Sequence, residues 1–126
     1  MATQTHTLGA AYAHALAAKD TAALVELLHP EIDFRGMTPR RIWEGDDPQT
    51  IVNDVFYTWF EPSDEIESVE HVDTDAFAGT ERVGYRFRVR NPDGAHLVEQ
   101  QAYIRERDGR IGWLRVMCSG FCAVSD

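Results

Sequence analysis

One stretch, TERVGYRFRVR at residues 80–90, constrains the fold more than any other feature of the chain. Valine, tyrosine, phenylalanine and valine alternate in it with four arginines. This period of two predicts a β-strand, because neighbouring side chains of a strand point to opposite faces of a sheet. The sequence therefore raises the question of which face meets solvent and which lines a core or a binding site.

Two turn signals place this strand in an antiparallel meander. NPDG at residues 91–94 predicts a turn into the strand AHLVEQQAYIRER, and the Asp-Gly pair at 108–109 predicts a tight hairpin into RIGWLRVMCSGF. A four-residue loop at the first turn places Arg86 opposite Glu99 and Gly84 opposite Gln101. A tight turn without a bulge then fixes which residues of the last strand share each face.

The residues before the meander predict mainly helices. Apolar spacing indicates a helix from Leu8 to Lys19, and Asp20 or Thr21 can cap a second, short helix that ends at His29-Pro30. EIDFR is expected to be a short strand, and GMTPRRIWEGDDP a loop or an irregular strand. Asp47 and Pro48 start a third helix to about Phe60, and a weakly patterned strand follows at 66–77. Helices followed by a meandering sheet predict one α+β domain spanning residues 1–126.

Composition excludes several classes of function. The chain has 126 residues, a net charge of −9 and a single lysine, Lys19, so binding to nucleic-acid phosphates is not expected. The apolar runs are too short to span a bilayer, and no membrane association is expected. Cys118 and Cys122 would lie roughly 13 Å apart in a strand, too far to bond, which favours a reduced, cytoplasmic protein. The five histidines show no metal-ligand spacing, so neither a metal nor another cofactor is expected.

Three segments, YAHALAAKDTAALVELLHPEIDF, WEGDDPQTIVNDVFYTWF and DGRIGWLRVMCSGF, together resemble the nuclear transport factor 2-like, or SnoaL-like, domains. These include ketosteroid isomerase, scytalone dehydratase and polyketide cyclases. The resemblance covers about residues 8–121 and implies a cone in which helices close over a strongly bent antiparallel sheet around an apolar pocket. It implies a small, mostly apolar ligand and cofactor-free isomerase, cyclase or dehydratase chemistry. The alternative is a non-catalytic ligand-binding or dimeric assembly domain.

Alignment with ketosteroid isomerases assigns a pocket side to the sheet, which holds Gln101, Tyr103, Leu114, Val116 and Cys118. Arg86 then turns toward the pocket beside Glu99. The other face is implied to form a homodimer surface, through Tyr85, Phe87, Trp113 and Met117. A second register stays open, in which a bulge makes the Tyr85 face the core and leaves every arginine outside.

The resemblance also implies catalytic roles. Tyr12 stands where the isomerase has its oxyanion tyrosine, and Gln101 stands at its second donor; Tyr12 is otherwise a core residue. Gly36 stands at the position of the general base and has no side chain. Glu99, paired with Arg86, is the replacement to consider, as a base or an acceptor; the alternative is a cross-strand ion pair.

The remaining candidates form the walls of the expected pocket. The aromatic set is core by default, and in this fold part of such a core lines the ligand site; it consists of Phe34, Trp43, Phe56, Trp59 and Tyr103. Cys118 is expected to be a small apolar wall residue rather than a nucleophile, because no histidine is placed to activate it.

Overall fold

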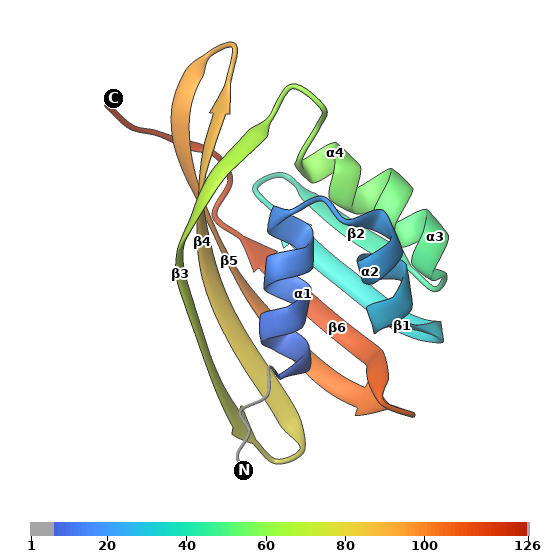
Figure 1. The fold of residues 1–126 in the computed structure, drawn as a ribbon. Coiled ribbons are helices and arrows are strands. Elements are labelled where there is room, and N and C mark those ends of the chain that lie inside the picture. Colours follow the sequence, from blue (N-terminus) through green and yellow to red (C-terminus); the bar gives the residue numbers. More distant parts are fainter. Residues whose placement is uncertain (1–6, 126) are drawn as a thin grey trace.

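The computed structural model describes residues 7–125, which form a bent sheet with helices packed on one side (Figure 1). The strands lie in the order β2-β1-β6-β5-β4-β3, and a short β7 pairs with β5. Their bounds are β1 Leu28–Thr38, β2 Arg41–Gly45, β3 Glu65–Phe77, β4 Thr80–Asn91, β5 Gly94–Arg107, β6 Arg110–Cys118 and β7 Cys122–Ala123. The structure confirms the expected α+β cone.

The helices begin where the sequence predicts them. Helix α1 is Leu8–Ala17 and α2 is Thr21–Leu27, whose N-cap Asp20 accepts a hydrogen bond from the Ala23 N–H at 3.1 Å. The third helical segment is continuous in the chain and comprises α3 Pro48–Thr50, the π-helical η1 Ile51–Phe56 and α4 Tyr57–Trp59. Asp47 caps it by accepting from the Thr50 N–H at 2.9 Å, since side-chain oxygens satisfy the free N–H groups of a first turn.

The sheet differs from the expected one in two respects. Strand β1 runs parallel to β6, so the sheet is mixed rather than purely antiparallel. The segment expected to be a loop or an irregular strand instead completes β1 and forms a hairpin with β2, in which Gly36 pairs with Trp43. Both features depend on contacts between distant or tightly turning segments, which local patterning does not reveal.

The register between β4 and β5 agrees with the prediction, with Arg86 opposite Glu99 and Gly84 opposite Gln101. The hairpin between β5 and β6 does not, because it contains a bulge. Arg105 pairs with Trp113 and the next residue, Glu106, pairs with Ile111, so Gly112 is the extra residue. A bulge shifts the face of every residue beyond it.

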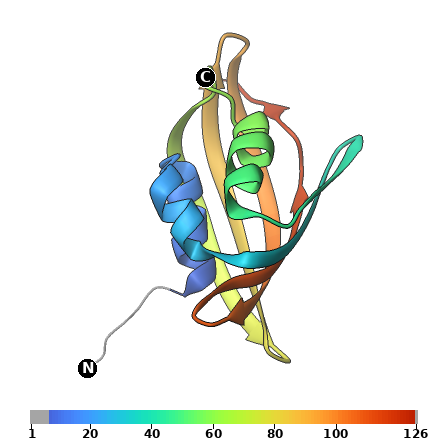
Figure 2. The same cartoon turned by 90° about the vertical axis from the view of Figure 1, so that its right-hand side faces the viewer.

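The second of the two registers is therefore the observed one. The inner face of the sheet, against which the helices pack, carries the apolar residues of the arginine strand, including Tyr85 and Phe87, which are at most 1% exposed. The expectation that these two residues form a dimer surface is wrong. Figure 2 shows α1 and α2 on one side of the sheet and the third helical segment beside them. These elements enclose one aromatic-rich core.

Candidate functional site

A hydrogen-bonded chain of three polar side chains crosses the buried inner face. The Tyr85 hydroxyl lies 3.0 Å from the Tyr12 hydroxyl and 2.5 Å from Oε1 of Gln100. All three residues are at most 1% exposed. Because an amide oxygen only accepts and a hydroxyl has one hydrogen, Tyr85 donates to Gln100 and Tyr12 donates to Tyr85. Two phenols and an amide thus form a directed chain from α1 across β4 to β5.

Burial sets the protonation of this chain. It raises the pKa of Tyr12 well above its ordinary value, because the interior disfavours the charged phenolate. Burial also raises the pKa of Tyr85, and the neighbouring Tyr12 adds to the effect. Both phenols therefore stay neutral at physiological pH, as hydrogen-bond donors rather than bases.

Two buried side-chain donors lack an acceptor. Within the described residues, the Nε2 of Gln100 and the Nε1 of Trp59 are buried side-chain nitrogens without a hydrogen-bond acceptor. The third such atom, Oε2 of Glu81, belongs to a carboxylate that binds the N-terminus of α1 through Gly9. A buried donor without an acceptor costs about 1–3 kcal/mol. The two nitrogens are therefore suited to a ligand that brings acceptor oxygens.

A pocket of about 240 Å³ opens at one end of the cone. It lies between the β1–β2 turn, the end of α4 and the segment after β6, and it is lined by Thr38, Pro39, Trp43, Thr58, Trp59, Phe60, Cys118, Gly120 and Phe121. Cys118 is the ladder partner of Gln100 in the neighbouring strand. Through Cys118, the pocket therefore adjoins the row of paired residues that contains Gln100 and Tyr85.

The position of the missing base is filled by an aromatic ring. A Cβ on Gly36 would lie 2.9 Å from Cζ2 of Trp59 and 3.0 Å from Cζ of Phe34. The other buried polar residues form their contacts elsewhere: His29 contacts Asp108, and Asp64 accepts from Asn91. In the described part of the chain, none of the hydrogen-bond partners of Tyr12, Tyr85 and Gln100 is a carboxylate or an imidazole. The site is a set of neutral donors.

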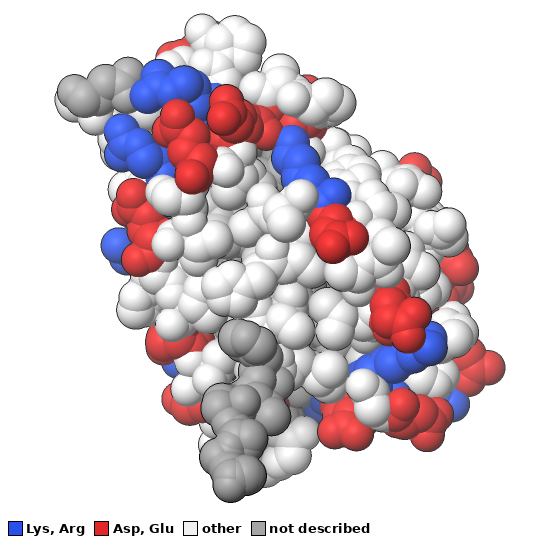
Figure 3. Space-filling view, viewed as in Figure 1, with Lys and Arg blue, Asp and Glu red and all other residues white. Residues whose placement is uncertain are grey.

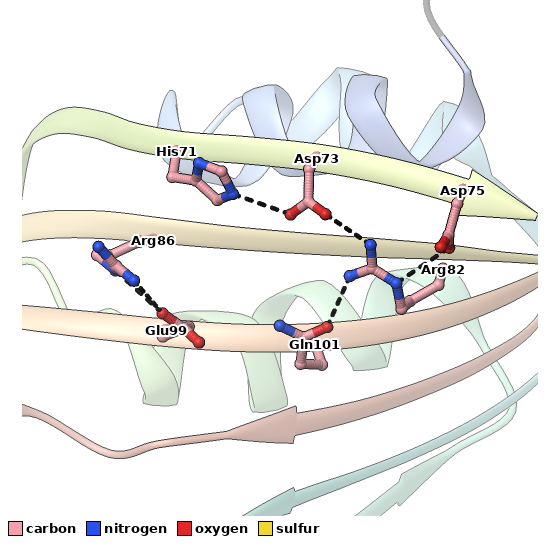
Figure 4. Close-up of polar contacts among 7 residues, drawn as sticks. All are labelled: His71, Asp73, Asp75, Arg82, Arg86, Glu99 and Gln101. Carbon is pink, nitrogen blue, oxygen red and sulfur yellow. Dashed lines mark hydrogen bonds and ion pairs between the residues drawn. The ribbon is translucent and has the colours of Figure 1, made fainter.

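Arg86, Glu99 and Gln101 lie on the opposite face of the sheet from Tyr12. Figure 4 shows them on the side away from the helices, which lie behind the strands in that view. Arg86 donates to Oε1 of Glu99 at 2.8 Å and 3.0 Å, and both side chains are almost half exposed, at 45% and 44%. The expectation that these three residues line the cone with Tyr12 is therefore wrong. It placed them one residue out of phase, because the bulge was not included.

Gln101 belongs to a polar network around Arg82 (Figure 4). Arg82 donates to Oε1 of Gln101 at 2.9 Å, to Asp73 at 2.6 Å and to Asp75 at 3.0 Å. Hydrogen bonds from Arg82 lower the pKa of Asp73. Every nitrogen of this guanidinium has an acceptor, so the network satisfies its own members rather than presenting a free group to a ligand.

The apolar candidates divide between the two faces. Phe34, Trp43, Phe56 and Trp59 pack against one another with ring centroids 5.5–6.3 Å apart. Leu114 and Val116 are buried on the same inner side, and Cys118 is partly buried against the core. Tyr103, by contrast, lies on the outer face and is 36% exposed. The sequence-based prediction did not include Tyr85 and Gln100 among the site residues. The isolated Gly112 was the available signal, because an isolated glycine in a strand indicates a bulge, and the bulge decides which residues face inward.

The outer face has a hollow of its own, with a volume of about 420 Å³. Its lining is mostly apolar with a few charges: Arg35, Gly36, Met37, Ile42, Glu44, Tyr103, Arg115, Val116 and Met117. Ile42 is 64% exposed and Met117 57%. Arg115 pairs with Asp33, whereas Arg35 and Glu44 form no ion pair with any residue that the structure describes.

Within 7–125, no group of three or more histidine, cysteine, aspartate or glutamate side chains is arranged to hold a metal ion. No helix in this range has the length and apolar character needed to cross a membrane. On the face shown in Figure 3, acidic and basic groups interleave around the edge and the centre is mostly uncharged.

Comparison with known proteins identifies the fold. No family model matches the sequence, and no curated protein matches it. A protein from Rhodopseudomonas palustris, provisionally described as an isomerase, has a TM-score of 0.70 at 13% identity and covers 93% of both chains. A protein from Xanthomonas campestris pv. campestris, provisionally described as a polyketide cyclase, has a TM-score of 0.68 at 15% identity, with 87% of this chain and 86% of that chain covered.

A third solved structure supplies the name of the fold. It is a nuclear transport factor 2-like protein of unknown function from Cytophaga hutchinsonii, with a TM-score of 0.58 at 17% identity, and the match covers 94% of this chain and 95% of that one. At these identities the likeness concerns the fold and leaves the chemistry to the residues of this chain. The chain thus has the cone-shaped fold of the nuclear transport factor 2-like, or SnoaL-like, proteins, as its sequence indicated.

Proposed function

We propose that the chain binds a small, mostly apolar molecule in the cone, with an acceptor oxygen of that molecule directed at the buried polar chain. The observation that carries this proposal is the pocket that Trp59 and Cys118 line, together with two buried donors that have no acceptor: the Nε1 of Trp59, and the Nε2 of Gln100, the strand partner of Cys118. The aromatic walls suit an apolar body, and the unpartnered nitrogens suit a carbonyl-type oxygen. No cofactor is needed for this recognition.

The chemistry that these residues support is electrostatic. Neutral donors directed at an oxygen that gains negative charge stabilise it without a proton transfer of their own. This is the catalytic contribution expected of a cofactor-free isomerase, cyclase or dehydratase. The solvent-facing position of Glu99 and the absence of a side chain on Gly36 leave this chain without the base that the resemblance implied, so ligand binding is the primary function we propose.

The binding can be tested through Cys118, which lies in the pocket wall. In a Cys122→Ser variant, which removes the second thiol, the rate of alkylation of Cys118 by iodoacetamide is measured with increasing benzylacetone, a small apolar ketone. A bound ketone should slow alkylation several-fold in a saturable manner. Arg86→Ala, which alters only the outer face, should leave the protection unchanged. A folded protein whose alkylation rate does not respond to any apolar ketone or hydrocarbon of this size would contradict the proposal.

We also propose that the outer face associates with a second copy of the chain. The exposed apolar residues Met37, Ile42 and Met117 support this, since contiguous groups of this kind are unusual on monomers. Arg35 and Glu44 are partners in the β1–β2 ladder, as are Met37 and Ile42. Consider a two-fold axis that lies against the outer face, parallel to the strands and midway between β1 and β2. It would place the arginine of each copy opposite the glutamate of the other copy. Each Met37 would then face an Ile42.

Charge reversal tests this association. Sedimentation velocity at micromolar concentration should show a dimer. Arg35→Glu or Glu44→Arg should raise its dissociation constant by about tenfold or more, because like charges then meet across the axis. The double variant should restore the dimer. Thermal melts of the four proteins control for folding. A monomeric wild-type protein, or a dimer that neither single reversal weakens, would rule out this arrangement.

A further inference from the structure

Cys118 has a hydrogen-bonded sulfur and a place in the pocket wall. Its sulfur accepts a hydrogen bond from the Gly120 N–H at 3.3 Å, and its side chain lines the pocket at the mouth of the cone. The sulfur is the nucleophilic atom of a cysteine side chain. A lone thiol is not a site, but Cys118 has a polar neighbour in the adjoining strand.

That neighbour is the amide of Gln100. Across the inner face, Tyr85, Gln100 and Cys118 occupy one row, because Gln100 pairs with Tyr85 in β4 and with Cys118 in β6. The amide oxygen is held by Tyr85, and the side chain of Gln100 projects from the same face of the sheet as that of its partner Cys118. This nitrogen is buried and has no acceptor. Directly paired residues of neighbouring strands have Cβ atoms about 5 Å apart.

A nucleophile and a hydrogen-bond donor on two directly paired residues suit one class of electrophile. In an α,β-unsaturated carbonyl compound, a nucleophile attacks the β-carbon while negative charge develops on the carbonyl oxygen, one conjugated unit away. Resting on the binding function proposed above, we propose that Cys118 captures such compounds by conjugate addition, with the Nε2 of Gln100 donating to the carbonyl oxygen.

The step needs no oxidant, reductant or metal. The sulfur of Cys118 forms a bond to the β-carbon, and the π electrons of the carbon–carbon bond move to give an enolate. The oxygen of the enolate accepts the hydrogen bond from Gln100. The proton that left the thiol is balanced by a proton that the α-carbon takes up from water. The net change is addition of S–H across the double bond, which is reversible and leaves a saturated ketone attached to Cys118.

This assignment differs from the expectation that Cys118 is an inert wall residue. That expectation rested on the lack of an activating histidine, and no histidine lines this pocket. Conjugate addition places less demand on such a base, because the developing charge forms on an oxygen that a neutral amide can stabilise.

The test compares two electrophiles on the same thiol. In Cys122→Ser protein, mass spectrometry follows adduct formation with benzylideneacetone, an unsaturated ketone, and with iodoacetamide, whose reaction forms no enolate. The ratio of the two rates cancels the accessibility and ionisation of the thiol. We expect this ratio to be about tenfold higher in the folded protein than in the same chain unfolded in denaturant, as a single donor to a developing oxyanion can provide.

Gln100→Met, which keeps the length of the side chain and removes its amide, should return the ratio to the unfolded value while the protein stays folded. If that variant does not fold, the comparison between folded and unfolded Cys122→Ser protein still decides. Equal ratios in the two states would overturn the proposal. If benzylacetone protects Cys118 but the ratio is not raised, the binding function stands and the covalent step is wrong. If benzylacetone gives no protection, the binding function itself fails.

Discussion

Replacing Tyr85 with phenylalanine removes the central member of the buried polar chain and keeps its ring. The hydroxyl of Tyr85 lies 3.0 Å from Tyr12 and 2.5 Å from Gln100, and no other described residue takes its place at either. The change leaves the hydroxyl of Tyr12 without an acceptor and the oxygen of Gln100 without a donor. Each orphaned buried group costs about 1–3 kcal/mol, so the expected loss in the free energy of unfolding for the two groups is about 2–6 kcal/mol.

The direction of the chain makes a sharper expectation. Tyr12→Phe removes only the terminal donor, because Tyr85 still donates to Gln100, and should cost about 1 kcal/mol. In the double variant, the hydroxyl that Tyr85→Phe orphaned is itself absent. The double variant should therefore be no less stable than Tyr85→Phe alone, and its loss should fall about 1–2 kcal/mol short of the sum of the single losses.

Urea melts of the wild-type protein, the two single variants and the double variant, followed by tryptophan fluorescence and circular dichroism, measure these differences. The expected losses fall within the usual stability of a small domain. The slopes of the melts should agree, which shows that the variants unfold from the same compact state. Two results would refute the reasoning: a Tyr85→Phe loss below about 0.5 kcal/mol, the value of an ordinary surface change, or strictly additive losses in the cycle.

Three further predictions follow from the same structure. Arg86→Ala should cost no more than about 0.5 kcal/mol, because both side chains of its pair with Glu99 are almost half exposed. Arg82→Ala should cost more in the same melts, because the Arg82 side chain is only 21% exposed and its guanidinium has three acceptors. Above pH 10, where unfolded tyrosine ionises but the raised pKa values of Tyr12 and Tyr85 keep the folded phenols neutral, the free energy of unfolding should fall by up to about 1.4 kcal/mol per pH unit for each tyrosine; melts across this range should show a shallower fall for Tyr12→Phe. Gly36→Ala should cost about 1–3 kcal/mol by thermal melting, because its Cβ meets the rings of Trp59 and Phe34, and a neutral result would show that these rings yield freely.

The parts of the fold that the sequence predicted are those with local causes. Asp20 and Asp47 cap their helices because a carboxylate satisfies the first free N–H groups whatever the rest of the chain does. Asp108 and Gly109 both adopt positive φ, at 54° and 81°, as the hairpin signal required. The parallel pairing of β1 with β6 has no such cause, since it depends on how the completed meander closes against the first strand.

The prediction of the candidate site was wrong in the register of one hairpin, by one residue, for an equally specific reason. The alignment that placed Leu114, Val116 and Cys118 on the inner side was right, and so was the pairing of Arg86 with Glu99. The two could be joined only by assuming a regular hairpin between β5 and β6. The same alignment also assigned Gln101 and Tyr103 to the cone, and with a regular hairpin Arg86 and Glu99 turned inward with them.

Gly112 explains both the error and the site. A Cβ at this position would lie 2.5 Å from the Cβ of Arg107, a separation that side chains cannot adopt, so the bulge requires glycine here. Without the extra residue, the inward-facing residues of β6 would lie on the same face of the sheet as the polar, exposed residues of β5. With it, Cys118 pairs with Gln100, and the buried amide, the thiol and the two tyrosines come to one surface. The chemistry of the cone thus depends on a backbone irregularity near the far end of the hairpin, where no functional side chain lies.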